Sequence, residues 1–414
     1  MQELFAHLSE NIYIISASLL FFGFLTGFVV NKFKFPRVTG YIIAGIIFGP
    51  SLINIFNEET LIHLDFVPQL ALGIIAVIIG SGLSIDLIRR LKFRLIIILM
   101  FESFGAFLFV FFVLTLFRMP LGAVLPLSAI AAATAPAATL YVIKECRATG
   151  PLTETALAIV ALDDAVAIIL FGLIMTIDIG HLESLGSAAL HSFYISGVEV
   201  FLAMLFGLIL GSVAHYLIRI TRDVTDSLII VLGAVFLGVG LANIFEVSAL
   251  LVNMFVGFFL INISPRNSDA IDHLEKMTPP IYCFFFVLAG AHLNVGVFAT
   301  VGFVVLLWSV LFVVSRILGK IVGAYLAGTI SKAPQTLRKY LGMTLAPQAG
   351  VAIGLSLLIT SASGYYDYKA IVLNVTVIGV AFNELIGPLF TKYALFKAGE
   401  AEEVRDKSYK LPGT

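Results

Sequence analysis

The sequence has few charged residues: only 12% of its 414 residues are Asp, Glu, Lys or Arg, whereas 60% are hydrophobic. Soluble domains carry about a quarter of charged residues, so this composition excludes an ordinary soluble protein and indicates a membrane protein with many spans. The chain has only two cysteines, Cys146 and Cys283, which lie in different apolar segments. Their number and placement exclude a disulfide framework and a cysteine-based metal site.

The chain also lacks an excess of charge of either sign, since its net charge is −1. No basic patch with interleaved aromatic residues is present, so nucleic acid is not expected as a partner. No Gly-x-Gly-x-x-Gly pattern enters a soluble βαβ unit, so no nucleotide-binding domain is expected. The first residues, MQELFAHLSENIY, lack a basic region and a small-residue cleavage site. We therefore expect the first apolar segment to remain as a helix.

Long apolar segments dominate the sequence, and a helix that crosses a bilayer needs about 20 such residues. We expect thirteen spans, at 12–31, 38–54, 66–84, 93–117, 121–144, 152–177, 192–218, 226–243, 247–263, 279–294, 296–328, 340–360 and 370–391. With the N-terminus outside, the loops and the C-terminal tail that fall inside hold 21 of the 25 Lys and Arg residues, and the outside segments hold Arg118 and Lys369. Positive residues stay on the cytoplasmic side, so the N-terminus is expected outside and the C-terminus in the cytoplasm.

The two halves of the chain resemble each other at a nearly constant offset of 209 to 211 residues. The matching segments are VTGYIIAGIIFG and VSALLVNMFVGF, GSGLSI and GAHLNV, TAPAA and LAPQA, and LDDAVAIILF and LNVTVIGVAF. Seven spans separate each segment from its mate, so the mates run in opposite directions. Inverted repeats of this kind are typical of secondary transporters, whose sites lie near the bilayer midplane where discontinuous helices meet.

Two prolines, Pro136 and Pro347, lie in the middle of the fifth and twelfth spans, each directly after an alanine. Proline removes a backbone donor and frees carbonyl groups, which a bilayer tolerates only inside protein or facing water. Two breaks at equivalent places of the repeat, which include Ala135 and Gln348, predict paired half-helices, with a simple kink as the alternative. Thr134 and Gln348 can offer oxygens to an ion there.

Two adjacent acids, Asp163 and Asp164, lie about ten residues into the sixth span, in ALDDAVAIILF. A charge near the bilayer centre costs roughly 2.5–3.5 kcal/mol on insertion scales. Adjacent helix residues point about 100° apart, so one carboxylate can line a cavity while the other faces a base; internal salt bridges alone are the alternative. The candidate bases are Arg316 and Lys320, four residues apart on one helix face. Arg316 would be a permanent counter-charge, and Lys320 either titrates or extends towards the inside surface.

Other polar residues in the spans carry weaker signals. Glu102 is a possible member of the site, and Asn374, at the repeat position of Asp163, is another. Glu199 and Glu384 are interpreted as boundary or helix-packing residues. His292, at the end of the tenth span, is interpreted as interfacial.

The segments TAPAAT, ALDDAVAI, SRILGKIVG and APQAGVAIGL, with FPRVTGYIIAGIIFGP, resemble the Kef/NapA-like branch of the monovalent cation:proton antiporter superfamily. The resemblance covers nearly all of residues 12–395. It implies an all-α polytopic membrane protein with 13 transmembrane helices, two inverted repeats and two crossed discontinuous helices. It further implies scaffold and dimerisation helices at about 12–85 and 222–295, core ion-transport helices at about 91–178 and 296–397, a linking helix at 192–218, and a homodimer.

In this family the second aspartate carries the ion and the proton, which implies Na⁺ at Asp164. The first, Asp163, pairs with a base of the eleventh span, which we align with Arg316. Electrogenic members have lysine there, so an arginine leaves one-for-one exchange open. Kef-type systems add a cytoplasmic nucleotide-binding domain, which is not expected here.

We therefore expect an antiporter that exchanges a monovalent cation, Na⁺ first, for protons by elevator-type movement in a prokaryotic inner membrane, serving pH homeostasis. No enzymatic activity is expected, and no cofactor beyond the transported ions. A K⁺/H⁺ antiporter and a sodium-coupled organic-anion symporter of related fold are the alternatives. An intramembrane aspartyl protease needs carboxylates that face each other from different helices, and a non-transporting scaffold leaves the buried acids unexplained.

Overall fold

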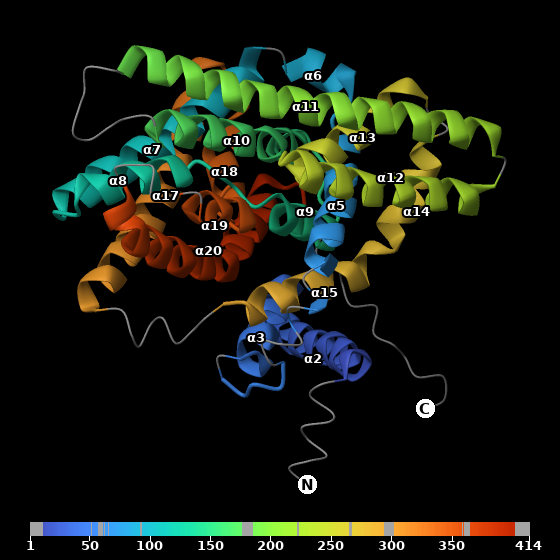
Figure 1. Ribbon diagram of the computed structural model, residues 1–414, viewed down its shortest axis with the longest axis horizontal. Coiled ribbons are helices and arrows are strands. Elements are labelled where there is room, and N and C mark those ends of the chain that lie inside the picture. Colours follow the sequence, from blue (N-terminus) through green and yellow to red (C-terminus); the bar gives the residue numbers. More distant parts are fainter. Residues whose placement is uncertain are drawn as a thin grey trace, which may run out of the picture.

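The computed structural model describes residues 11–50, 52–56, 61, 63–64, 66–91, 93–175, 185–221, 223–264, 267–293, 302–357, 359 and 365–401, and within them the chain is helical with no strand (Figure 1). The helices are α2 (Ile12–Lys32), α3 (Arg37–Phe48), α5 (Phe66–Ser81), α6 (Ile85–Leu91), α7 (Phe93–Leu116), α8 (Leu121–Ile130), α9 (Pro136–Glu145), α10 (Pro151–Met175), α11 (Leu185–Ile220), α12 (Val224–Phe245), α13 (Ala249–Ile263), α14 (Asn267–Lys276), α15 (Thr278–Ala291), α17 (Phe303–Ile330), α18 (Gln335–Thr344), α19 (Gly350–Leu357) and α20 (Lys369–Ala398), with a 3₁₀ turn, η2 (Tyr366–Tyr368).

Each predicted apolar segment contains at least one of these helices. Among the described residues, seven helices are long and apolar enough to cross a membrane: α2, α7, α10, α12, α17, α20 and the part of α11 from Gly197 to Ile220. Five shorter apolar helices, α3, α5, α8, α13 and α15, accompany them. The protein is therefore an all-helical polytopic membrane protein.

The predicted boundaries need several corrections. The second predicted span runs six residues too far, because Gly49 leaves the helical conformation and ends α3 at Phe48. Helix α11, which contains the seventh predicted span, begins at Leu185, seven residues before the predicted start. The first residues of the eleventh predicted span lie outside the described residues, and α17 begins at Phe303.

Two helix pairs, α3 with α15 and α5 with α13, pack with their backbones in contact at glycines. A Cβ atom would collide with a carbonyl of the partner helix at each of four positions: Gly45 with Val287, Gly290 with Ile42, Gly257 with Val77, and Gly80 with Met254. Small residues allow this approach in membrane helices. The first two contacts lie between α3 and α15, and the other two between α5 and α13.

These four contacts match the internal repeat. Ile42 and Gly45 make the contacts that Met254 and Gly257 make 212 residues later, and Val77 and Gly80 correspond to Val287 and Gly290, 210 residues later. The sequence alignment of the second and ninth spans used an offset of 209, which is three residues short. Three residues are nearly one helical turn, so a slip of this size leaves an apolar pattern almost unchanged.

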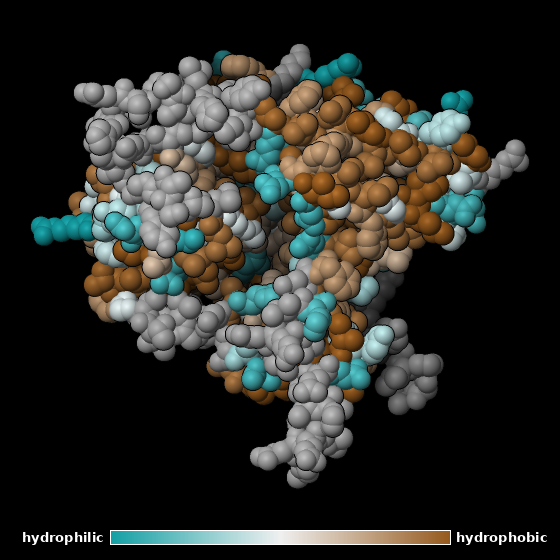
Figure 2. Space-filling model, in the orientation of Figure 1, coloured by the Kyte–Doolittle hydropathy of each residue, from teal (hydrophilic) through white to brown (hydrophobic). Residues whose placement is uncertain are grey.

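The helices form two groups (Figure 1). The outer group contains α2, α3, α5, α12, α13 and α15, and the crossing group contains α7 to α10 and α17 to α20. Helix α11 packs on α12 and α13 of the outer group and also on α10 of the crossing group. In Figure 2 the visible face over α11 and α12 is mostly hydrophobic. The large exposed side chains of these two helices include Phe201, Ile209 and Phe236. Such a surface suits contact with lipid tails.

Candidate functional site

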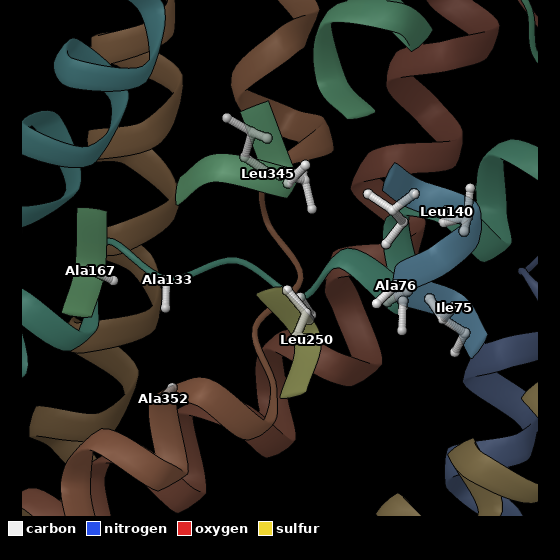
Figure 3. Packing of buried hydrophobic residues seen from close by; sticks show 14 of the residues in the cluster. Ile75, Ala76, Ala133, Leu140, Ala167, Leu250, Leu345 and Ala352 are labelled. Carbon is white, nitrogen blue, oxygen red and sulfur yellow. The ribbon is translucent and has the colours of Figure 1, made fainter. Parts of the chain in front are cut away.

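The crossing group contains two interrupted helices that meet at their breaks. Helix α8 ends at Ile130 and α9 begins at Pro136, while α18 ends at Thr344 and α19 begins at Gly350. The backbone N–H of Ala135 donates to the carbonyl of Pro347 at 2.9 Å. Figure 3 shows the two extended segments crossing, with Ala133 on one and Leu345 at the start of the other. The expected pair of half-helices is present, and Pro136 is the first residue of a helix rather than a kink within one.

Arg316, on α17, holds this crossing together. Its guanidinium is fully buried and donates to the carbonyls of both breaks: Ala131 (3.1 Å), Ala133 (2.6 Å), Leu345 (3.4 Å), Ala346 (2.7 Å) and Pro347 (3.3 Å). These carbonyls lack helical partners because the helices stop there, and the negative ends of the α8 and α18 dipoles lie at the same place. The positive charge of Arg316 therefore compensates two helix ends at once.

Lys320, one turn further along α17, is the base that lies against Asp163. Its Nζ is 2.6 Å from Oε2 of Glu102, 2.7 Å from the carbonyl of Ala132 and 3.5 Å from Oδ2 of Asp163. The predicted pairing of Asp163 with Arg316 is thus wrong in this structure, because Arg316 is engaged by the breaks. The argument for one-for-one exchange that rested on Arg316 falls with it. Lys320 is also fully buried and does not extend to the surface.

Close packing of α7 on α17 explains why Glu102 reaches Lys320. A Cβ atom at Gly319 would meet the carbonyl of Gly105, and one at Gly323 would meet the backbone of Glu102. The two backbones therefore approach closely at the level of Lys320. Glu102 is fully buried and also accepts a hydrogen bond from Ser103 at 2.8 Å. Glu102 therefore lies close to Asp163, and the two carboxylates share the ammonium group of Lys320.

Asp163 and Asp164, on α10, differ in their surroundings although both are buried. Oδ2 of Asp163 faces Lys320, whereas Oδ1 of Asp163 and both carboxylate oxygens of Asp164 have no hydrogen-bond partner among the described residues. Thr134, in the first break, lies beside both carboxylates, with its hydroxyl towards Asp163 and its backbone N–H towards Asp164. The positive end of the α9 dipole is next to it. Three carboxylate oxygens and the hydroxyl of Thr134, all buried, therefore gather at the break, and the neighbouring donors are the hydroxyl and the backbone N–H of Thr134.

Gln348 lies in the second break, as predicted, and contacts the first. Its Nε2 donates to the carbonyl of Ile130 at 2.9 Å, and its Oε1 accepts from Asn383 on α20 at 3.0 Å. Gln348 therefore links the two breaks and connects them to α20, and its predicted role as an oxygen ligand stays a prediction. Asn374 is half-buried on α20, and no hydrogen bond between it and the crossing is found within the described part of the chain. Asn383 is a contact residue of the breaks that was not predicted, although an amide inside the apolar run VIGVAFNELIG is a usable signal.

The remaining polar residues lie apart from these contacts. Glu384 is buried on α20, and its Oε2 has no partner among the described residues. Glu199 is half-buried on α11, and His292 is exposed directly after α15. Their predicted roles in packing or at the interface stay predictions.

Comparison with known proteins gives a consistent result. The family described as "Sodium/hydrogen exchanger, transmembrane" matches residues 17–397. Two structures of the sodium proton antiporter MjNhaP1 from Methanocaldococcus jannaschii are similar in fold: one at pH 8, with 16% identity and a TM-score of 0.71, and an electron-microscopy map, with 18% identity and a TM-score of 0.74. Each match covers 94% of this chain and 98% of the other. At these identities the similarity concerns the fold alone. No curated protein matches the chain in sequence.

Proposed function

The chain belongs to the sodium/hydrogen exchanger family, and from this premise we propose that it exchanges Na⁺ for protons at Asp164 by alternating access. Members of the family are transporters, so the protein is a membrane antiporter for a cation and protons and not an enzyme. The observation that carries the assignment of the site is the buried, unpartnered carboxylate of Asp164. A carboxylate in such a place needs a cation or a proton to compensate its charge.

Competition for the same oxygens would couple the two ions. Na⁺ is a hard cation that prefers oxygen ligands, and the oxygens of Asp164, Oδ1 of Asp163 and the hydroxyl of Thr134 supply them. A proton on Asp164 removes the charge that attracts Na⁺, and bound Na⁺ disfavours the proton. The site therefore holds one or the other, and the transported ions take the place of a cofactor.

Glu102 would keep Asp163 available to the cation. The ammonium of Lys320 is 2.6 Å from Glu102 but 3.5 Å from Asp163. A lysine shared in this way neutralises Asp163 less than an exclusive ion pair does. In this proposal Arg316 is the fixed positive charge that stabilises the crossing. Lys320 is the base whose ion pairs change when the aspartates gain or lose an ion.

We propose that the crossing group is the moving core and that the outer group is the fixed scaffold. The core moves past the scaffold, and α11 links the two. The thirteen-span count, the orientation with the N-terminus outside, a prokaryotic inner membrane and a homodimer built on the outer group are parts of the same proposal. Its support is the charge bias of the loops and the continuous packing of α3 with α15 and α5 with α13, which suits a rigid frame.

The test is exchange by the purified protein in proteoliposomes with a trapped pH dye, comparing Na⁺, Li⁺ and K⁺. We expect Na⁺ and Li⁺ to move protons against an imposed ΔpH, and Asp164→Asn to abolish this exchange. Asp226→Asn, at an exposed aspartate of α12, removes the same charge and should leave exchange intact. A response to K⁺ alone would make the protein a K⁺/H⁺ antiporter, and exchange by Asp164→Asn at the rate of the unmodified protein would overturn the assignment.

A further inference from the structure

A large cleft lies between the outer group and the crossing group, away from the aspartates. It has a volume of about 1180 Å³ and is lined by side chains of α2, α3 and α15 on one side and of α9 and α20 on the other. Figure 2 shows a hollow with hydrophilic residues around it between these parts of the molecule. Nothing in the exchange mechanism above uses this space.

The lining of the cleft is strongly basic. It contains six basic residues and one acid, Glu145; the bases are Lys32, Lys34, Arg37, Lys144, Arg147 and Lys392. Glu145 is itself engaged, since its two oxygens accept from the side-chain amide of Asn31 at 2.9 Å and from the backbone N–H of Arg37 at 3.0 Å. Lys144 is paired with Glu275 at 2.6 Å. Among the described residues, no ion pair to a carboxylate is found for four of the other bases: Lys32, Arg37, Arg147 and Lys392.

Aromatic side chains surround these bases on the outside of the molecule. Phe28, Phe33 and Tyr393 also line the cleft and are 47%, 71% and 51% exposed. The ammonium of Lys32 lies 4.7 Å from the ring centre of Phe28. Exposed aromatic rings next to lysines are typical of the level where lipid headgroups meet the hydrocarbon region. A positive cleft repels the transported cation, so its charge suits an anion from the membrane better than it suits a cation path.

We propose that this cleft binds the phosphate headgroup of an anionic phospholipid from the leaflet on the positively charged side of the protein. The phosphate lies among Lys32, Arg37 and Lys392, and the acyl chains run outward along Phe28, Phe33 and Tyr393. Because α2 and α3 belong to one helix group and α9 and α20 to the other, the bound lipid contacts both groups at once. The binding step does not depend on the proposed exchange, so each can fail without the other.

The test measures lipid binding to the full-length protein in detergent by native mass spectrometry. Phosphatidylglycerol is compared with phosphatidylcholine of the same acyl chains, and inorganic phosphate and glycerol 3-phosphate are added as competitors. The variant Lys32→Gln/Arg37→Gln/Lys392→Gln removes three charges from the cleft. The control Arg89→Gln/Lys332→Gln/Lys339→Gln removes three exposed charges outside it.

We expect phosphatidylglycerol to be retained in preference to phosphatidylcholine. Each base in contact with the lipid is worth about fivefold in affinity. The cleft variant, which lacks three of them, should therefore lose about a hundredfold, and the control should keep its affinity. Should the triple variant fail to fold, Lys392→Gln alone should lose about fivefold, and thermal stabilisation by phosphatidylglycerol should fall in parallel. Equal binding of the two lipids, or an equal loss in the control, overturns the proposal. Displacement of the lipid by equimolar phosphate would assign the cleft to a soluble phosphate compound instead.

Discussion

The outer group and the crossing group are both built from repeat-related helices in close contact, yet among the residues that the structure describes only the crossing group buries charged pairs. In the outer group, α3, α5, α13 and α15 are continuous, so their backbone groups are satisfied within each helix, and the contacts are between glycine and carbonyl. A buried polar residue there, Asn253 of α13, is neutral and donates to its own helix at the carbonyl of Ala249.

In the crossing group the interrupted helices leave carbonyls without helical donors. Arg316, Lys320 and Gln348 supply these donors, and the two bases bring positive charge to the centre of the protein. The buried acids Glu102 and Asp163 then have partners, which makes their burial affordable on electrostatic grounds. The charged site therefore follows from the broken backbone, and substitutions in the two groups should have different effects.

The largest effect is expected from Arg316→Met. The substitution keeps an apolar chain of similar length but removes the donor of four buried carbonyls, those of Ala131, Ala133, Leu345 and Ala346, and one of the two donors of Pro347. The free energy of unfolding should therefore fall by at least about 4 kcal/mol. Thermal unfolding in detergent measures the loss. Arg89→Met, at an exposed position, is the control and should change stability by no more than about 0.5 kcal/mol. Unchanged stability of Arg316→Met would contradict the role given to this residue.

In the outer group, Gly80→Ala should destabilise the protein by about 1–3 kcal/mol, because the new Cβ meets the carbonyl of Met254 and forces α5 from α13. Gly233→Ala, where a Cβ meets open space, is the matched control and should be neutral. The folded fraction of Gly80→Ala should keep the apparent KM for Na⁺. A changed cation preference without a loss of stability would show that the two groups are not separate in function.

Glu102→Gln removes the carboxylate that competes with Asp163 for the ammonium group of Lys320. The ammonium should then pair fully with Asp163 and compete with the cation, raising the apparent KM for Na⁺ by about tenfold, which corresponds to about 1.4 kcal/mol. Glu102→Asp keeps the charge and should recover part of the affinity. Exchange measured over a range of Na⁺ concentrations separates KM from the maximal rate. An unchanged KM in Glu102→Gln would remove Glu102 from the site.

The smallest effect concerns Glu145, which joins the two groups at the end of α9. Burial raises the pKa of Glu145, although the N–H of Arg37 and the charge of Lys392 act in the other direction. The folded protein therefore favours the neutral form of Glu145. The stability that this form contributes is complete below the ordinary glutamate pKa of about 4.3, and it is lost as the pH rises through the raised pKa of the folded state. Glu145→Gln should lack this dependence and differ from the unmodified protein by about 1 kcal/mol or less. The free energy of unfolding of both proteins, measured from below about pH 4.3 to above the raised pKa, checks this prediction. Parallel pH profiles of Glu145→Gln and the unmodified protein would contradict it.

The sequence predicts the breaks at Pro136 and Pro347 and the position of the two aspartates because proline and buried charge leave strong local signals. The sequence does not decide whether Arg316 or Lys320 pairs with Asp163, because the two bases are four residues apart on one helix face. Only the position of the crossing determines which base it contacts. Glu102 was recognised only as a possible member, because its partner is 218 residues away and depends on the close approach of Gly105 and Gly319. Tertiary contacts of this kind have no local pattern.

The most direct test of the account is whether Na⁺ displaces protons from the isolated protein. NaCl is added to the purified protein in weakly buffered detergent solution, and the released protons are measured with a pH indicator, with choline chloride as the control. The account predicts proton release on Na⁺ addition that is absent in Asp164→Asn and retained in Asp226→Asn. Saturable Na⁺ binding without proton release over the whole pH range, or release that persists in Asp164→Asn, would contradict it.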